Sequence, residues 1–254
     1  MRALRMLEAP GPPRSCRNLD CPRHVPVSMR PLSLPLLVLW IALPVLADEP
    51  HPLAVQALAA LDAFDEDAWT FTRTTTGTEG NRIQRHDATQ PEAVRWTLLE
   101  VDGRKPAKSE IEKFRRERAE IRAGRKKGSE DDQDVDHRSI RLLSETPDRA
   151  TFSFRPKRGR GIEGRFAEHV VGTLVVNKDG AWAERFELRN DSGMSPIPGV
   201  KVSRFRLTLT FQRIAESGHV VPASIELILR GRAFMVKSLD QDRSIRYSGF
   251  VRAR

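Results

Sequence analysis

The sequence predicts a mainly β protein with two helices, folded as one curled antiparallel sheet. Three observations lead to this fold class. About ten segments have the composition of strands, short turns join most of them, and apolar and polar residues alternate along the longest ones. About ten strands are too many for a flat open sheet with a single N-terminal helix, so we expect the sheet to curl into a partial or complete barrel.

The folded part is predicted to begin with a helix over 51–64. Its apolar residues recur at steps of three and four: Leu53, Ala54, Ala57, Leu58, Leu61 and Phe64. Strands are then predicted over 68–75, 81–86, 93–101, 140–144, 150–155, 170–176, 182–189, 200–214, 220–230 and 233–251. Turn residues such as Asp102-Gly103 separate consecutive strands, which favours hairpins in an antiparallel meander.

Alternation is clearest over 202–214. Phe205, Leu207, Leu209 and Phe211 share one face of this strand, and arginines and threonines occupy the other. Ile225, Leu227 and Leu229 continue the apolar face on the next strand. One side of the sheet is therefore expected to be apolar and the other to face water.

A charged helix over about 107–126 interrupts the strands. Ser109 followed by Glu112 fits a capping box. Ile111, Phe114 and Ile121 form a narrow apolar stripe, with Arg118 between them, and most of the remaining residues are charged. We expect this helix to lie against the body or over an opening, followed by an acidic loop over 128–136.

Residues 29–47 have the pattern of a secretory signal peptide. Met29-Arg30 is basic, 36–43 is apolar, and Val45-Leu46-Ala47 is a cleavage signal before Asp48. We interpret 1–28 as a leader upstream of the true start and 48–254 as one domain. Both cysteines, Cys16 and Cys21, precede the cleavage site, so the expected compartment is a bacterial periplasm. An uncleaved anchor is the alternative, although 32–46 is shorter than the ~20 apolar residues of a membrane span.

Motifs for known chemistry fail in their context. Gly159–Gly164 matches G-x-G-x-x-G without a parallel crossover unit. A calcium loop starting at Asp132 would need glycine and glutamate where the chain has His137 and Leu143. No metal-binding histidine pair and no nucleophile elbow occur. We therefore expect no cofactor, no metal and no catalytic residues, with an unrecognised hydrolase as a remaining alternative. The 37 basic and 32 acidic residues of 48–254 give a modest net charge of +5, and nucleic acid is not an expected partner.

The apolar face is the candidate ligand-binding site. Its predicted residues occupy strand positions that can face inward: Trp69, Phe71, Trp96, Leu98, Trp182, Phe186, Phe205, Leu207, Leu209, Phe211, Ile225, Leu227 and Leu229. Two helices, one of them mostly charged, are little cover for a curled sheet of this size. Part of the concave surface is therefore expected to be open to a ligand.

This order of elements resembles the LolA/LolB-like half-barrel lipoprotein carriers of the periplasm. The shared features are a signal peptide, an N-terminal helix, a long antiparallel meander and a helix inserted after the early strands. The resemblance implies a half-barrel whose concave surface accepts acyl chains, with helices as a lid. The dense charge of the inserted helix departs from that pattern. Locally, His86-Asp87, Pro91, 96–103 and Pro106 resemble a segment of uncharacterised secreted proteobacterial proteins.

The expected function is that of a periplasmic, non-enzymatic binding protein that takes a lipid or the acyl chain of a lipidated protein into its concave face. Peripheral contact with a membrane fits this interpretation. The alternative is an envelope interaction or sensor protein whose sheet is fully packed and which binds a protein partner.

The cleavage signal before Asp48 predicts where the exported protein begins. N-terminal sequencing of the periplasmic fraction is expected to start at Asp48, because Ala47 ends the small-residue cleavage motif. An exported protein that retains Trp40 would contradict this interpretation.

Overall fold

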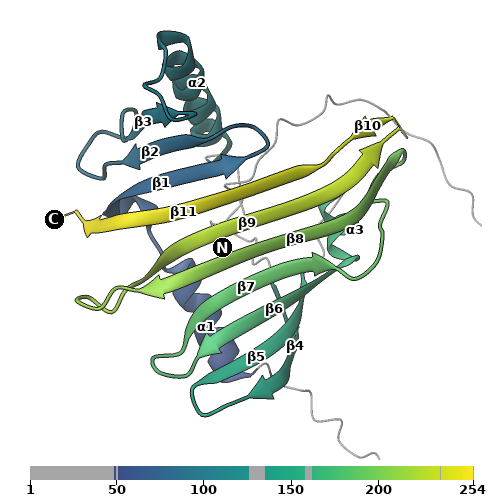
Figure 1. The fold of residues 1–254 in the computed structure, drawn as a ribbon. Coiled ribbons are helices and arrows are strands. Elements are labelled where there is room, and N and C mark those ends of the chain that lie inside the picture. Colours follow the sequence, from purple (N-terminus) through teal and green to yellow (C-terminus); the bar gives the residue numbers. More distant parts are fainter. Residues whose placement is uncertain (1–48, 50, 126–134, 158–161, 235, 254) are drawn as a thin grey trace, which may run out of the picture.

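In the computed structural model, an open antiparallel sheet forms the body of the protein (Figure 1). The structure describes residues 49, 51–125, 135–157, 162–234 and 236–253. The expected leader, signal peptide and cleavage site (1–48), most of the acidic loop and Gly159–Gly161 lie outside the described residues. The expected fold class, mainly β with a curled antiparallel sheet, is confirmed.

Three α-helices are present among the described residues, one more than the sequence predicts. They are α1 (Pro52–Asp62), α2 (Lys108–Arg125) and the short α3 (Ile162–Ala167), with a 3-10 turn at Glu66–Ala68. The first seven strands are β1 (Trp69–Gly77), β2 (Arg82–His86), β3 (Trp96–Val101), β4 (Val135–Glu145), β5 (Arg149–Pro156), β6 (Val170–Asn177) and β7 (Trp182–Asn190). The last four are β8 (Val200–Arg213), β9 (Val220–Ala233), β10 (Lys237–Ser238) and β11 (Gln241–Arg252).

The strand order differs from a simple meander. Among the described residues the order is β3-β2-β1-β11-β9-β8-β7-β6-β5-β4, and β10 pairs with β9. β3 and β4 follow one another in the chain but lie at opposite edges, while β1 pairs with β11, from Trp69 opposite Arg252 to Gly77 opposite Arg243. No turn connects these two strands, so the local signals that predict hairpins carry no information about their pairing.

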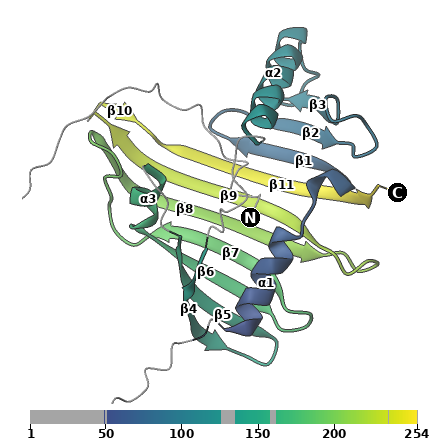
Figure 2. The same cartoon turned by 180° about the vertical axis from the view of Figure 1, so that it is seen from behind.

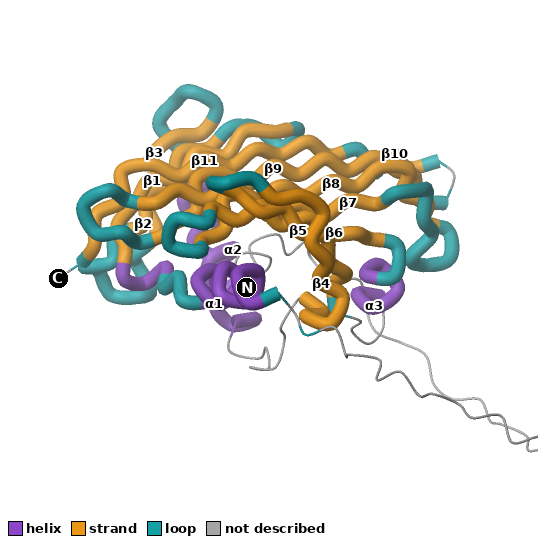
Figure 3. The backbone as a smooth tube through the Cα atoms, turned by 90° about the horizontal axis from the view of Figure 1, so that it is seen from below, coloured by secondary structure: helices purple, strands orange, loops and turns teal. Residues whose placement is uncertain are grey.

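The sheet curves into an arch with its apolar face on the inside (Figure 3). α1 lies inside the arch and packs on β6 and β7. Pro52 occupies its first turn, where the absent backbone N–H leaves no hydrogen bond unmade. Ala54, Ala57 and Leu58 are buried against the sheet. Two small residues let the helix axis approach the strands closely.

α2 stands at the β3 edge of the sheet (Figure 1). The expected capping box, Ser109 with Glu112, is wrong: the helix begins at Lys108, and the backbone N–H of Ala107 donates to Glu110 Oε2 at 2.7 Å. Glu110 is thus the residue that reaches back to the start of the helix. Among the described residues, no helix is long and apolar enough to cross a membrane.

The last predicted strand, 233–251, is divided in the structure. Phe234 adopts a positive φ of 49°, and the chain turns there into β10 before β11 begins at Gln241. A positive φ is unfavourable for a bulky side chain, so the composition of this segment does not indicate the turn.

Gly172 on β6 has no side chain and so leaves room for the Phe154 ring in the core. The two residues are opposite each other in the β5–β6 register, and the Phe154 ring contacts Phe186 with 4.9 Å between ring centroids. A Cβ atom on Gly172 would lie 2.1 Å from two carbons of the Phe154 ring. A side chain at this position therefore forces the ring out of its contact.

We expect Gly172→Ala to reduce the free energy of unfolding by about 1–3 kcal/mol, the usual cost of overpacking a core. Urea denaturation followed by circular dichroism measures it. Gly193→Ala is the matched control, because the nearest atom to a Cβ there is 3.8 Å away. Equal stability of the two variants would contradict this account of the packing.

Candidate functional site

The inside of the arch is lined by rows of apolar side chains that run across the strands. One row consists of residues opposite one another on neighbouring strands: Phe152, Leu174, Phe186, Leu209, Ile225 and Ile245. All six are buried and belong to one cluster. A second row passes through Leu188, Leu207 and Leu227. The register therefore unites strands from β5 to β11 in one apolar surface.

The structure brings most of the sequence-predicted site residues together. Those that are buried are Trp69, Phe71, Leu98, Phe186, Leu207, Leu209, Ile225 and Leu227. Those that are half-buried are Trp96, Trp182, Phe205, Phe211 and Leu229. Leu98 belongs to a separate small cluster with Val101 and Phe114, and Trp96 packs against both clusters. Trp96 thus links α2 to the inside of the arch.

Trp182 and Leu229 are outside both clusters, and a β-bulge explains the position of Trp182. Val175 is opposite Arg185, whereas the next residue, Val176, is opposite Ala183. The extra residue on β7 reverses the alternation there, so that Ala183, not Trp182, continues the buried face of Phe186. Strict period-two alternation predicts the opposite arrangement for this strand end.

Aromatic rings fill the end of the inside face formed by β1, β2 and β11. Phe71 has ring-centroid distances of 5.6 Å to Trp96, 5.7 Å to Tyr247 and 5.2 Å to Phe250. His86 stacks on Phe71 at 5.1 Å, and its Nδ1 lies 2.7 Å from the Trp69 carbonyl oxygen. This end of the arch is therefore tightly packed and also contains polar groups.

Two arginines converge beside these rings. Arg73 Nε donates to Gln84 Oε1 at 2.9 Å, and Arg73 Nη2 donates to the same oxygen. Arg118 Nη2, from α2, donates to that oxygen at 3.1 Å. Both guanidinium groups also lie over the Trp96 ring, Arg118 at 4.0 Å and Arg73 at 4.6 Å from its centroid. We call Arg73, Gln84, Trp96 and Arg118 the arginine cluster.

Burial makes this cluster electrostatically unusual. Arg73 is only 8% exposed, and burial lowers the pKa of its guanidinium, while Tyr247 and Glu66 act in the opposite direction. Burial likewise raises the pKa of the Tyr247 hydroxyl, which is therefore neutral at pH 7. An arginine stays protonated in a protein, so a positive charge is held inside the apolar end of the arch.

Arg73 and Gln84 are not among the sequence-predicted site residues, although the sequence contains a signal for both. Arg73 follows Trp69 and Phe71 at steps of two on β1, so the alternation that predicts the buried face includes it. Gln84 and His86 share the buried face of β2 in the same way. A charged residue at a strand position that the alternation assigns to the buried, apolar face is a candidate functional residue.

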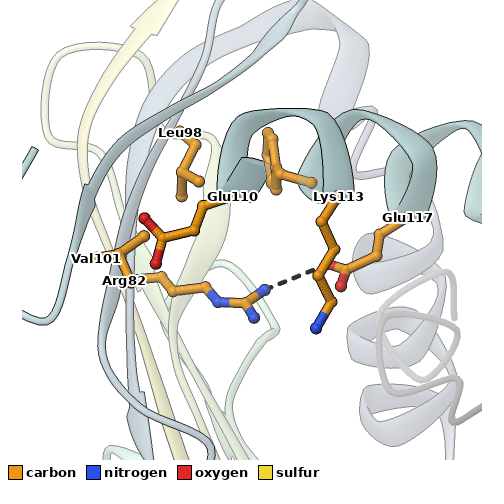
Figure 4. Close-up of a pocket in the computed structure, with 7 residues that line it drawn as sticks. Arg82, Leu98, Val101, Glu110, Lys113 and Glu117 are labelled. Atoms are coloured by element: carbon orange, nitrogen blue, oxygen red, sulfur yellow. Dashed lines mark hydrogen bonds and ion pairs between the residues drawn. The ribbon is translucent and has the colours of Figure 1, made fainter. Parts of the chain in front are cut away.

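A small cavity lies between α2 and the sheet edge (Figure 4). Its volume is about 120 Å³, and its lining residues are Arg82, Leu98, Val101, Glu110, Lys113, Phe114 and Glu117. Figure 4 shows the charged ends of Arg82, Lys113 and Glu117 at one side and Leu98 at the other. Binding pockets for small organic ligands usually measure ~300–1,000 Å³. This cavity is too small for a lipid.

Ion pairs attach α2 to the sheet edge around buried Phe114. Arg82 Nη1 lies 3.2 Å from Glu117 Oε2, and Arg104 holds Glu110 with two hydrogen bonds of 2.8 and 2.9 Å. The Arg104 guanidinium and the Ala107 N–H lower the pKa of Glu110 to about 2. Only one apolar side chain of α2 is deeply buried, so these polar contacts share in positioning the helix.

Neither similarity to known proteins nor a metal-binding group assigns a function to this chain. The chain matches no protein-family model and no curated protein sequence. Within the part of the chain that the structure describes, no group of three or more histidine, aspartate, glutamate or cysteine residues is arranged to hold a metal ion. The inside of the arch and the arginine cluster at its end are therefore the features on which a function can be argued.

The lowered pKa of Glu110 predicts that α2 loosens in acid. Its ordinary pKa is 4.5, so the stabilisation from the Arg104 pair is complete above about pH 4.5 and is lost as the pH falls toward 2. Hydrogen exchange of the α2 amides is expected to show lower protection at the acidic end of this range than at neutral pH.

Glu110→Gln is expected to lower the protection of α2 already at neutral pH, because the amide makes no ion pair with Arg104. Glu112→Gln, at an exposed position of the same helix, is the control and should behave like the wild type. Equal protection of α2 in the wild type across the whole acidic range would refute the role of this pair.

Proposed function

We propose that this protein is a non-enzymatic binding protein of the periplasm that takes the acyl chain of a lipid or lipidated protein into the inside of the arch. The observation that carries this proposal is the combination of an open sheet with a continuous apolar inner face. The edges β3 and β4 do not pair, so the arch is not closed by hydrogen bonds. The row from Phe152 to Ile245 nevertheless extends without a polar break from β5 to β11.

The position of the helices supports the proposal. α1 makes its main contacts with β6 and β7, α3 with β6 and α2 with β3. Seen from behind in Figure 2, no described helix crosses the middle of β8, β9 and β11. A ligand chain that lies along this strip contacts side chains of the sheet alone, without displacing a helix of the described chain.

Half-buried aromatic rings surround the strip. Phe205 on β8 contacts Phe166 of α3 with 4.7 Å between centroids, and Phe250 packs beside Trp69 at 6.1 Å. Each methylene group that leaves water for such a surface contributes about 0.8 kcal/mol. A long acyl chain therefore gains enough to bind through non-directional apolar contacts, without a dedicated polar site.

One observation favours the alternative, an interaction or sensor protein with a packed sheet that binds a protein partner. Leu207 and Leu209, in the middle of the strip, are 1% and 4% exposed. A surface that stays buried at all times cannot receive a ligand. The two functions therefore differ in whether water and acyl chains reach these leucines.

Leu207→Glu separates the two functions. If the strip receives a ligand, the carboxylate remains partly hydrated, and the free energy of unfolding should change by about 1 kcal/mol or less while uptake of cis-parinaric acid, a fluorescent fatty acid, is lost. In a permanently packed core an unpaired buried charge costs several kcal/mol. Urea denaturation and probe fluorescence measure the two effects.

Gln212→Glu is the matched control, since it adds the same charge at an exposed position of the same strand. It should leave both stability and uptake unchanged. Unfolding of Leu207→Glu together with a wild type that takes up no probe would overturn the acyl-binding proposal in favour of the packed interaction domain.

A further inference from the structure

We infer that the turn between β9 and β11 is a docking site for a lipid surface that contains anionic head groups. This hairpin tip consists of Phe234 and Val236 with three exposed basic residues around them, Lys201, Arg232 and Lys237. Figure 1 shows the tip, marked by β10, at the far end of the long strands β8 and β9. It lies outside the strip proposed for acyl chains, so the inference goes beyond the proposed function and does not depend on it.

The hairpin tip exposes two apolar side chains that contribute little to folding. Phe234 is 74% exposed and Val236 is 89% exposed, the two highest values among the large apolar residues of the described chain. Neither belongs to either of the two apolar clusters that the described residues form. Single exposed apolar residues are common on protein surfaces, whereas two at one projecting turn point to a contact.

The backbone holds the Phe234 ring in this exposed position. Phe234 has a φ of 49°, in the left-handed region that bulky side chains rarely adopt. Its N–H donates to the Gly199 carbonyl oxygen at 2.6 Å, and a Cβ atom on Gly199 would lie 2.7 Å from Phe234 Cε1, so the ring rests on the glycine backbone. The strain of the positive φ is thus not compensated by burial of the ring, and such strain is typical of functional sites.

Basic side chains surround the two apolar ones. Lys201 on β8 is opposite Arg232 on β9, and Lys237 lies on β10, which pairs with the same end of β9. Like charges that are opposite each other on neighbouring strands repel. Within the described chain, no acidic residue forms an ion pair with any of these three residues. An anionic surface would relieve their repulsion.

The acidic residues that follow the tip do not neutralise this charge. Asp240 Oδ1 accepts a hydrogen bond from the Gly231 N–H at 3.2 Å. Asp242 Oδ2 lies 2.6 Å from Arg230 Nη2, so that its charge is offset by an arginine outside the basic set. The hairpin tip therefore keeps an excess of positive charge beside its apolar side chains.

A lipid surface fits both features. Apolar side chains can enter the boundary between head groups and acyl chains, while lysine and arginine stay at the level of the phosphates. Each basic residue near an anionic membrane strengthens binding about fivefold. A stable protein interface buries about 800 Å² on each partner, far more than two side chains at a turn provide. A lipid surface needs no complementary shape, so a small tip is sufficient.

The test measures cosedimentation of the exported protein with vesicles of phosphatidylcholine alone and of an equal mixture of phosphatidylcholine and phosphatidylglycerol. The wild type should bind the mixed vesicles more tightly, and added salt should weaken this binding because it screens the charges. Phe234→Asn should reduce affinity for the mixed vesicles about tenfold, because the apolar ring is lost. Asparagine tolerates a positive φ, so this variant should be at least as stable as the wild type toward urea.

A second variant tests the basic residues. Arg232→Gln combined with Lys237→Gln should reduce affinity for the mixed vesicles at least about tenfold and leave binding to phosphatidylcholine alone unchanged. The matched controls lie at the opposite end of β11. Val251→Asn removes an apolar side chain that is 64% exposed, and Arg252→Gln removes an exposed charge. Both controls should bind vesicles like the wild type.

Three results would overturn the inference: a wild type that binds neither kind of vesicle, equal wild-type affinities for both kinds, or a Phe234→Asn variant that binds as tightly as the wild type. If the wild type instead dimerises in solution and Phe234→Asn does not, the tip is an interface between two copies of this chain and the inference is wrong. Uptake of cis-parinaric acid should be the same in the wild type and Phe234→Asn, so the vesicle result is independent of the acyl-binding proposal.

Discussion

The antiparallel pairing of β1 with β11 joins two parts of the chain that no turn connects, and the arch depends on it. On one side of this pairing stand β2 and β3 with α2, and on the other the strands from β9 to β4. Without it the molecule would have two smaller sheets, each with an additional open edge and an exposed apolar face. The pairing also places Tyr247 opposite Arg73 and so completes the buried end of the arch.

The curvature of the sheet determines how its apolar residues are covered. A flat sheet of this size would need a full layer of helices to cover one face, whereas an arch encloses its own inner face. α1 is therefore sufficient at β6 and β7, and Gly172 allows the large Phe154 ring to fit between β6 and the rest of the core. The same geometry leaves a strip across β8, β9 and β11 whose cover does not come from a described helix, which is the physical basis of the proposed acyl site.

The guanidinium of Arg73, at the end of that strip, is buried, and its burial is energetically unfavourable. Burying Arg73 beside aromatic rings requires desolvation of a guanidinium, and the compensation comes from Gln84, the Trp96 ring and Tyr247.

Local periodicity in the sequence determined the fold class, the strands and most of the inner face, because whether a residue lies inside or outside a strand depends on its neighbours two positions away. The same rule places Arg73 and Gln84 inside. Only the tertiary structure decided the pairing of β1 with β11, the exclusion of Trp182 by a bulge and the contact of Arg118 with Gln84. Each of these depends on residues far apart in the chain, and such contacts follow from the packing of the whole sheet and leave no periodic signal in any single segment.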